Sequence, residues 1–194
     1  ATRRNLELTE TLRDKKKRGT LLWVLDKTKT AMGARLLRSF VEQPLIDTAQ
    51  MEERLSAVSF FKEQALCREE IREYLTGVYD LERLLARISY RTAGPRDMVA
   101  FGNSLRLLPG IKMALKDAES CPAMERLSKA LDVLEDIEEL ISSALVEEPP
   151  LSPREGGMIR KGYHQEVDHF REVAMNGKQW LADLEEETRT RTGI

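Results

Sequence analysis

The sequence has few of the residues that build metal centres, disulfide frameworks or membrane anchors. It contains two cysteines among 194 residues, Cys67 and Cys121, and their spacing fits no CxxC motif. A structural zinc site or a disulfide framework is therefore not expected. No apolar run approaches the roughly 18 residues that a membrane-spanning helix needs, and no signal-peptide pattern opens the chain. These absences predict a cytoplasmic protein without a membrane partner.

Motifs for catalysis are also missing. Gly156 and Gly157 lie in neither a phosphate-binding loop nor a dinucleotide-binding fingerprint. His164 and His169 are five residues apart, so they do not share a helix face as a pair of zinc ligands would. The acidic residues between 132 and 139 fit the solvated side of an amphipathic helix better than a catalytic carboxylate pair. We therefore expect no catalytic, cofactor-binding or metal-binding residues and do not expect this chain to be an enzyme.

The formal net charge of −2 conceals an uneven distribution. Residues 1–38 hold eleven Lys and Arg against four Asp and Glu, whereas residues 117–148 hold two against ten, giving local charges of +7 and −8. One hypothesis is a weak contact with nucleic-acid phosphates. Its residues would be Arg13, Lys15, Lys16, Lys17 and Arg18. A solvated loop is the interpretation we favour, because no aromatic side chains interrupt this basic run.

Hydrophobic periodicity predicts a mainly α fold, a bundle of several helices preceded by one short strand. The strand is predicted over 4–10, where polar and apolar residues alternate. Thr30 is the expected N-cap of a helix over 31–43 that ends before Pro44, and Asp47 is the expected N-cap of the next helix. The apolar stripe over 124–145 predicts one long helix within the core.

The C-terminal region predicts a long charged helix over 164–190 with a narrow apolar seam. Its seam positions are separated by alternating steps of three and four residues, the a/d pattern of a helix that pairs with one partner helix. A helix of this length spans roughly 40 Å and should project beyond a small domain. Without its partner we expect it either to fray or to have a neighbouring molecule along the seam in a crystal. The seam consists of Val167, Phe170, Ala174, Gly177, Leu181 and Leu184.

Several segments together match the motifs of one known family. Residues 30–45 resemble a T-x-M-G-x-R-x-L-x-x-W-L-x-x-P-L helix, with Phe40 in place of Trp and Val41 in place of Leu. Residues 80–87 resemble a D-L-E-R helix, and residues 154–163 an R-E-G-G-x-I-x-x-G-Y segment that leads into a lever helix, although His164 departs from the residue usual there. In these motifs the chain resembles the MutS family of DNA mismatch-repair proteins, and residues 3–8 resemble that family's entry strand.

The resemblance covers almost the whole chain, in order, and implies the core domain and the start of the lever helices. Residues 1–150 would be the helical core, residues 151–163 a Pro/Gly crossing segment, and residues 164–194 the start of a lever leading toward an absent clamp domain. Two Phe-x-Glu sequences, starting at Phe61 and Phe170, match the family's mismatch-reading motif by letters. Each Phe falls on a helical apolar stripe, so we interpret both as packing residues.

The resemblance implies a structural role that couples mismatched-DNA binding to ATP binding and hydrolysis elsewhere in an intact protein. It further implies ATP and magnesium for that protein, a homodimer, other mismatch-repair proteins as partners, and a bacterial, nucleoid-associated location. A stand-alone adaptor or dimerisation module that uses the seam is the alternative. Arg35 and Arg83 are candidates for orienting helices within the core, and a plain surface role for both is the equal alternative. The residues expected to matter structurally are Gly33, Arg35, Gly156, Gly157 and Gly162.

Overall fold

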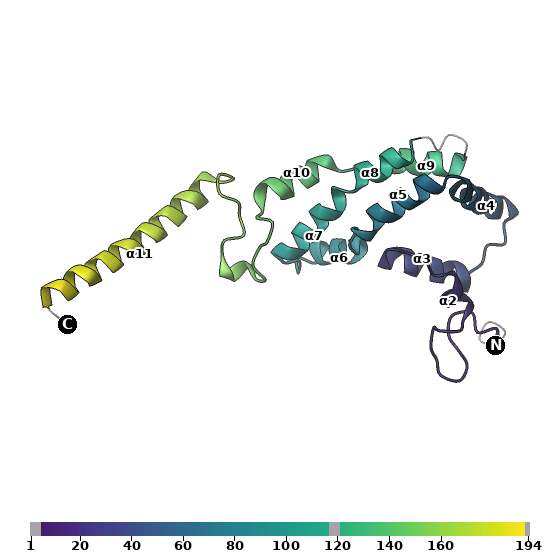
Figure 1. Cartoon of the computed structure of the whole chain (residues 1–194), viewed down its shortest axis with the longest axis horizontal. Helices are drawn as coiled ribbons and strands as arrows, with labels where there is room; N and C mark the ends of the chain where they lie inside the picture. Colours follow the sequence, from purple (N-terminus) through teal and green to yellow (C-terminus); the bar gives the residue numbers. More distant parts are fainter. Residues whose placement is uncertain (1–4, 117–120, 193–194) are drawn as a thin grey trace.

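Short helices form a bundle from which one long helix projects (Figure 1). The computed structural model describes residues 5–116 and 121–192. Within these ranges the mainly α fold is confirmed, and the only β pairing is an isolated antiparallel bridge between Leu145 and Ile159. The helices are α2 Leu21–Leu25, α3 Ala31–Glu42, α4 Thr48–Glu63, α5 Ala65–Thr76, α6 Leu81–Ser89, α7 Pro95–Leu105, α8 Leu108–Ala114, α9 Pro122–Ala130, α10 Glu135–Ala144, the 3₁₀ turn η2 Pro153–Glu155, and α11 Gln165–Thr192.

Side-chain caps define where the helices begin. Thr30 Oγ1 accepts a hydrogen bond from the Gly33 amide at 3.0 Å, and Asp47 Oδ1 accepts one from the Ala49 amide at 2.9 Å. Each cap satisfies an amide that has no partner inside its own helix. Both predicted N-caps are confirmed.

The N-terminal strand prediction is wrong for residues 5–10, and Arg4, its first residue, lies outside the described residues. Glu7 has a φ of 47°, a left-handed conformation that no strand contains. Its carboxylate accepts the Leu12 amide at 2.7 Å, and the Leu8 carbonyl accepts the Leu22 amide at 2.9 Å. The segment therefore bonds through local turns and to α2, and the described residues contain no strand that could pair with it.

The single helix predicted over 124–145 is two helices, α9 and α10, separated by residues 131–134. Leu134 has a φ of 51°, and its amide donates to Asp132 Oδ1 at 3.1 Å. Lys112 Nζ donates to the Leu131 carbonyl at 2.8 Å, which provides a partner for a carbonyl released by the break. Leu131, Val133 and Leu134 pack against the core, so the apolar stripe continues although the helix does not.

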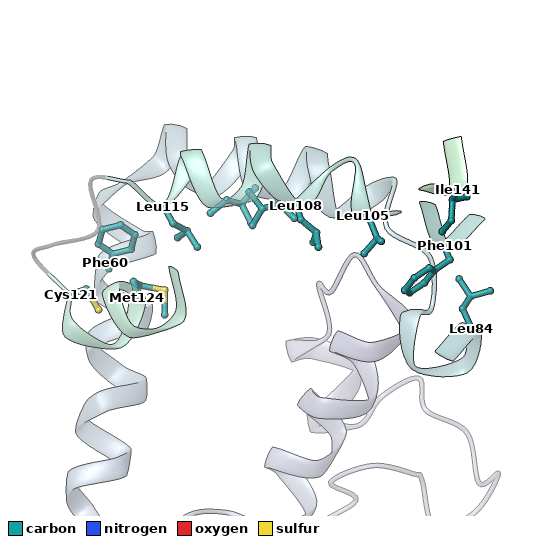
Figure 2. Packing of buried hydrophobic residues seen from close by; sticks show 11 residues of the cluster. Phe60, Leu84, Phe101, Leu105, Leu108, Leu115, Cys121, Met124 and Ile141 are labelled. Carbon is teal, nitrogen blue, oxygen red and sulfur yellow. The ribbon is translucent and has the colours of Figure 1, made fainter. Parts of the chain in front are cut away.

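The core is an elongated strip rather than a central cluster. Helix α5 packs on α8, α4 on α5 and α9, and both α6 and α10 on α7. Phe60, Cys121 and Met124 lie at one end of the strip, and Leu84 and Phe101 lie at the other, with Leu105, Leu108 and Leu115 between them (Figure 2). This arrangement holds α10, and the segment that follows it, at one end of the bundle.

Helix α11 differs from the bundle in being largely exposed. It extends away from the other helices (Figure 1), and none of its residues is buried. It remains helical through Thr192, so the expectation that it frays is wrong within the described residues. Gly193 and Ile194, the last two residues of the predicted lever segment, lie outside the described residues. No described helix is both long enough and apolar enough to cross a membrane.

Candidate functional site

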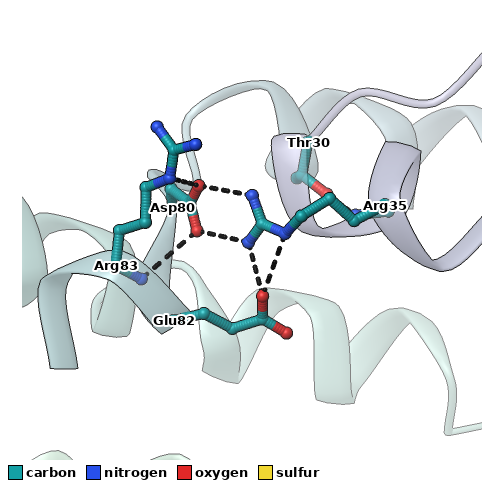
Figure 3. Close-up of polar contacts among 6 residues, drawn as sticks. Thr30, Arg35, Asp80, Glu82 and Arg83 are labelled. Carbon is teal, nitrogen blue, oxygen red and sulfur yellow. Dashed lines mark hydrogen bonds and ion pairs between the residues drawn. The ribbon is translucent and has the colours of Figure 1, made fainter. Parts of the chain in front are cut away.

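Helices α3 and α6 are joined by four charged side chains, named here the Arg35 cluster: Arg35, Asp80, Glu82 and Arg83 (Figure 3). The Arg35 guanidinium binds both Asp80 carboxylate oxygens at 2.8 Å, and its Nε donates to Glu82 Oε2 at 3.2 Å. Asp80 is also the N-cap of α6, with Oδ1 accepting the Arg83 amide at 3.4 Å. One carboxylate therefore begins α6 and holds α3 against it.

The electrostatics of the Arg35 cluster follow from this geometry. The hydrogen bonds from the Arg35 guanidinium lower the pKa of Asp80 to about 2. The hydrogen bonds to the Asp80 and Glu82 carboxylates in turn raise the pKa of Arg35. A bidentate guanidinium–carboxylate pair constrains orientation as well as distance, because the two planar groups must align. The cluster is therefore suited to fixing the angle between two helices.

Thr30 and Gly33 position Arg35 at the start of α3. A Cβ atom on Gly33 would lie 3.0 Å from Thr30 Oγ1 and 3.6 Å from Thr28 Cβ. The first turn of α3 thus closes tightly around its own cap, and a larger residue at position 33 would press on the capping oxygen. Arg83 contributes less to the joint, since its side chain is mostly exposed and lies 3.4 Å from Asp80 through Nε.

The basic residues predicted to contact phosphate all lie exposed in the loop between the N-terminal turns and α2. The loop is closed by its own hydrogen bonds, from the Thr11 amide to the Lys16 carbonyl at 2.9 Å and from the Lys15 amide to the Thr11 carbonyl at 3.1 Å. Lys17 forms an ion pair with Asp26, which lowers the pKa of Asp26 to about 2. The structure thus gathers the basic side chains on one loop and uses one of them to close it against α2.

The seam of α11 is open. Phe170 and Leu181 are 69% and 59% exposed, respectively, and Trp180 adds a further exposed apolar side chain beside Leu181. Nothing covers Phe170 within the described residues, so its packing against a partner helix stays a prediction. Phe61, the other Phe-x-Glu residue, stacks edge-on against Phe60 with ring centroids 5.2 Å apart and packs against the core.

Four residues, which we name the lever root, join α11 to the bundle: Ile159, Gly162, Asp168 and Arg171. The sequence analysis selected Gly162 but missed the other three. Asp168 Oδ2 accepts the Gly162 amide at 2.7 Å, and Arg171 Nη2 donates to the Ile159 carbonyl at 2.7 Å. Asp168 and Arg171 also contact each other at 3.4 Å. The detectable signal was an acidic and a basic residue three positions apart at the start of a predicted helix.

The three glycines of the crossing segment all have positive φ values. These are 73° at Gly156, 74° at Gly157 and 89° at Gly162, a region that side chains with a Cβ rarely occupy. A Cβ at any of them would meet no atom within 4 Å, so backbone conformation rather than close packing favours glycine there.

The described residues contain no group of three or more His, Cys, Asp or Glu side chains able to hold a metal ion. Among the acidic residues of α10, Glu138 pairs at 2.9 Å with Arg106, the C-cap of α7, which is a structural contact between two helices. The features that the structure does bring together are helix joints and an uncovered helix face. They define a class of protein: a helical scaffold that carries a projecting lever.

Comparison with known proteins identifies the family within this class. The profile of the family described as MutS domain III matches residues 1–190, so the chain belongs to that family. It is 54% identical over 194 residues to the DNA mismatch repair protein MutS of Lachnoclostridium phytofermentans, 47% to that of Acetivibrio thermocellus and 46% to that of Bacillus subtilis. Each alignment covers all of this chain but only 21–22% of the relative. The chain therefore spans about a fifth of the length of the curated relatives it matches.

Proposed function

We propose that this chain is the core and the beginning of a lever in a bacterial, cytoplasmic mismatch-repair ATPase, where it couples mismatched-DNA binding to ATP binding and hydrolysis. In this proposal it carries no catalytic residue. The observation that supports it most strongly is the match to MutS domain III across residues 1–190, combined with a helical bundle that holds one long, otherwise unsupported helix. A rigid bundle with a lever can transmit a displacement because packed cores shift between discrete arrangements.

The partner of the lever seam in this proposal is a second lever helix of the intact protein that returns antiparallel to α11. The a/d spacing of the seam fits a single partner helix, and its exposed side chains are apolar while the rest of α11 is largely charged. Mismatched DNA, ATP with magnesium, a second subunit and other mismatch-repair proteins would then engage regions of the intact protein outside this chain.

The first test uses the purified chain and a chimera. The chain alone should neither hydrolyse ATP nor prefer a mismatched to a matched duplex, as measured by phosphate release and by fluorescence anisotropy. The chimera carries this chain in place of the matching region of the Lachnoclostridium phytofermentans protein, and it should retain ATP turnover that responds to mismatched DNA. The unaltered Lachnoclostridium protein is the control. ATP turnover by the chain alone would refute the proposal, as would a folded chimera whose turnover ignores DNA.

A second candidate function is a weak phosphate contact by the basic loop. It is supported by the exposure of Arg13, Lys15, Lys16 and Arg18 on one loop. Binding of a matched duplex by the chain at low salt, lost when these residues become Ser and weakened by added salt, would support it. The stand-alone adaptor is the less favoured alternative, because the family match includes the core as well as the seam.

A further inference from the structure

The chain leaves the end of α10 and returns to it before entering α11. The Val146 amide donates to the Met158 carbonyl at 3.0 Å, and the Arg160 amide donates to the Ala144 carbonyl at 2.7 Å. Together with the bridge between Leu145 and Ile159, these bonds join residues 144–146 to residues 158–160. Residues 147–157, which include Gly156 and Gly157, therefore form a loop whose two ends are tied together.

This closed loop is also docked on the bundle. Arg96, in the first turn of α7, donates through Nε to the Pro149 carbonyl at 3.0 Å, and Pro149 is buried. The backbone freedom of Gly156 and Gly157 thus acts within a loop that begins and ends at the same place. Bending there alters the shape of the loop without necessarily moving the chain that follows it.

The first two turns of α11 bind the returning arm directly. Arg171 donates to the Ile159 carbonyl, and Asp168 accepts the Gly162 amide, both at 2.7 Å. The Asp168 and Arg171 side chains are 19% and 32% exposed, so water competes only partly for these bonds. Ile159 is also the residue bridged to Leu145 after α10, so α11 is held by the same arm that pairs with the bundle.

The connection continues from α10 into the bundle. Helix α10 packs on α7, and a Cβ on Gly102 of α7 would lie 2.9 Å from Ile141 Cγ2, which shows how closely the two helices approach. A path of hydrogen bonds and close packing thus runs from α11 through Arg171, Ile159 and Leu145 to α10 and α7. It bypasses Gly156 and Gly157.

We propose that Asp168 and Arg171 are positioning residues that set the direction of α11 relative to α10, and that loop 147–157 lies outside this mechanical connection. The relevance of that direction to coupling rests on the proposed function, but the geometry can be tested without it. Gly162 is then a fixed part of the lever root rather than a free hinge, because its amide is held by Asp168.

The experiment measures distances between spin labels on α10 and α11 in the whole chain by pulsed electron paramagnetic resonance. The labels are attached through unnatural amino acids at Glu139 and Lys178, both exposed, so that Cys67 and Cys121 remain unchanged. In R171M we expect the population of other lever orientations to rise roughly tenfold, as for the loss of a hydrogen bond to a charged donor. D168N should broaden the distribution less, since an amide oxygen can still accept the Gly162 amide. R171K should stay close to the wild type.

Two controls isolate the connection. R189M makes the same change at the far end of α11 and should leave the distances unchanged. Insertion of two glycines between Gly156 and Gly157 should also leave them unchanged, because the loop is bypassed. Circular dichroism checks that every variant keeps its helical content.

The proposal is overturned if folded R171M keeps the wild-type distribution, or if the glycine insertion broadens it as much as R171M does. In the chimera described above, R171M should uncouple ATP turnover from mismatched DNA. If R171M broadens the distances but ATP turnover in that chimera still responds to mismatched DNA, the role of the lever direction in coupling is refuted. The positioning role of the lever root then stands. If R171M leaves the distances unchanged and ATP turnover in the chimera still responds to mismatched DNA, the positioning role of the lever root is refuted and the proposed function stands.

Discussion

The bundle and α11 are both helical but are stabilised in different ways. Helices α4 to α10 each contribute side chains to a shared core strip, with Leu105 2% exposed at its centre. Helix α11 buries no residue and is held only through its first turns. In globular proteins most helical stability comes from packing rather than from intrinsic propensity. The bundle thus contains a buried core of its own, whereas α11 presents an exposed apolar face suited to another helix.

The largest expected difference comes from removing a leucine side chain in each region. L105A leaves a cavity in the core strip and should reduce the free energy of unfolding by about 2–5 kcal/mol. L181A removes the same atoms from the open seam and should change it by less than about 0.5 kcal/mol. Urea unfolding followed by circular dichroism measures both. Equal losses in the two variants would mean that the seam is already covered, for example by a second copy of the chain.

A smaller effect is expected at Ser104 in α7, whose side chain is fully buried. Its Oγ accepts the Tyr79 amide at 3.0 Å and donates to the Ala100 carbonyl at 2.9 Å, which ties the segment between α5 and α6 to α7. S104A leaves the Tyr79 amide without this acceptor and should cost about 1–3 kcal/mol. S143A is the matched control, because Ser143 is exposed and bonds only locally to the Leu140 carbonyl. A loss in S143A as large as that in S104A would contradict this reasoning.

The smallest effect concerns acid stability and the Arg35 cluster. Because the folded-state pKa of Asp80 is lowered to about 2 by Arg35, its contribution is fully present above its ordinary pKa of 3.8 and is lost as pH falls through 2. The stability advantage of the wild type over D80N should therefore shrink between about pH 4 and pH 2. Urea titrations at several pH values measure this. R35M should reduce the same pH dependence, and a pH-independent gap between the wild type and D80N would exclude the linkage.

Local sequence signals located the helix starts that depend on local chemistry. Thr30 and Asp47 act as caps because the donor and acceptor lie within three residues of one another, so no distant partner is needed. The same reasoning failed at residues 5–10, where alternation predicted a strand but the part of the chain that the structure describes holds no strand to pair with it. It failed again at residues 131–134, where the apolar stripe continues while Lys112, from another helix, binds the Leu131 carbonyl.

The residues of the candidate site fall into the same two groups: those recognisable from local sequence and those that depend on distant segments. Arg35 and the crossing glycines could be selected from the sequence, since they belong to segments that resemble the family. The role of Asp168 and Arg171 could not be predicted. Their partners, the Gly162 amide and the Ile159 carbonyl, take up their positions only when the returning arm pairs with the end of α10.

The sequence by itself determined the family, the mainly helical fold, two helix caps and the apolar seam of a long terminal helix. These features depend on residue spacing and on contacts between residues a few positions apart, so they can be derived from the sequence. Only the tertiary structure decided that α9 and α10 are separate, that Arg35 joins α3 to α6, and that the crossing loop closes on itself. The physical reason is that each depends on atoms from segments distant along the chain, and their proximity is a product of packing.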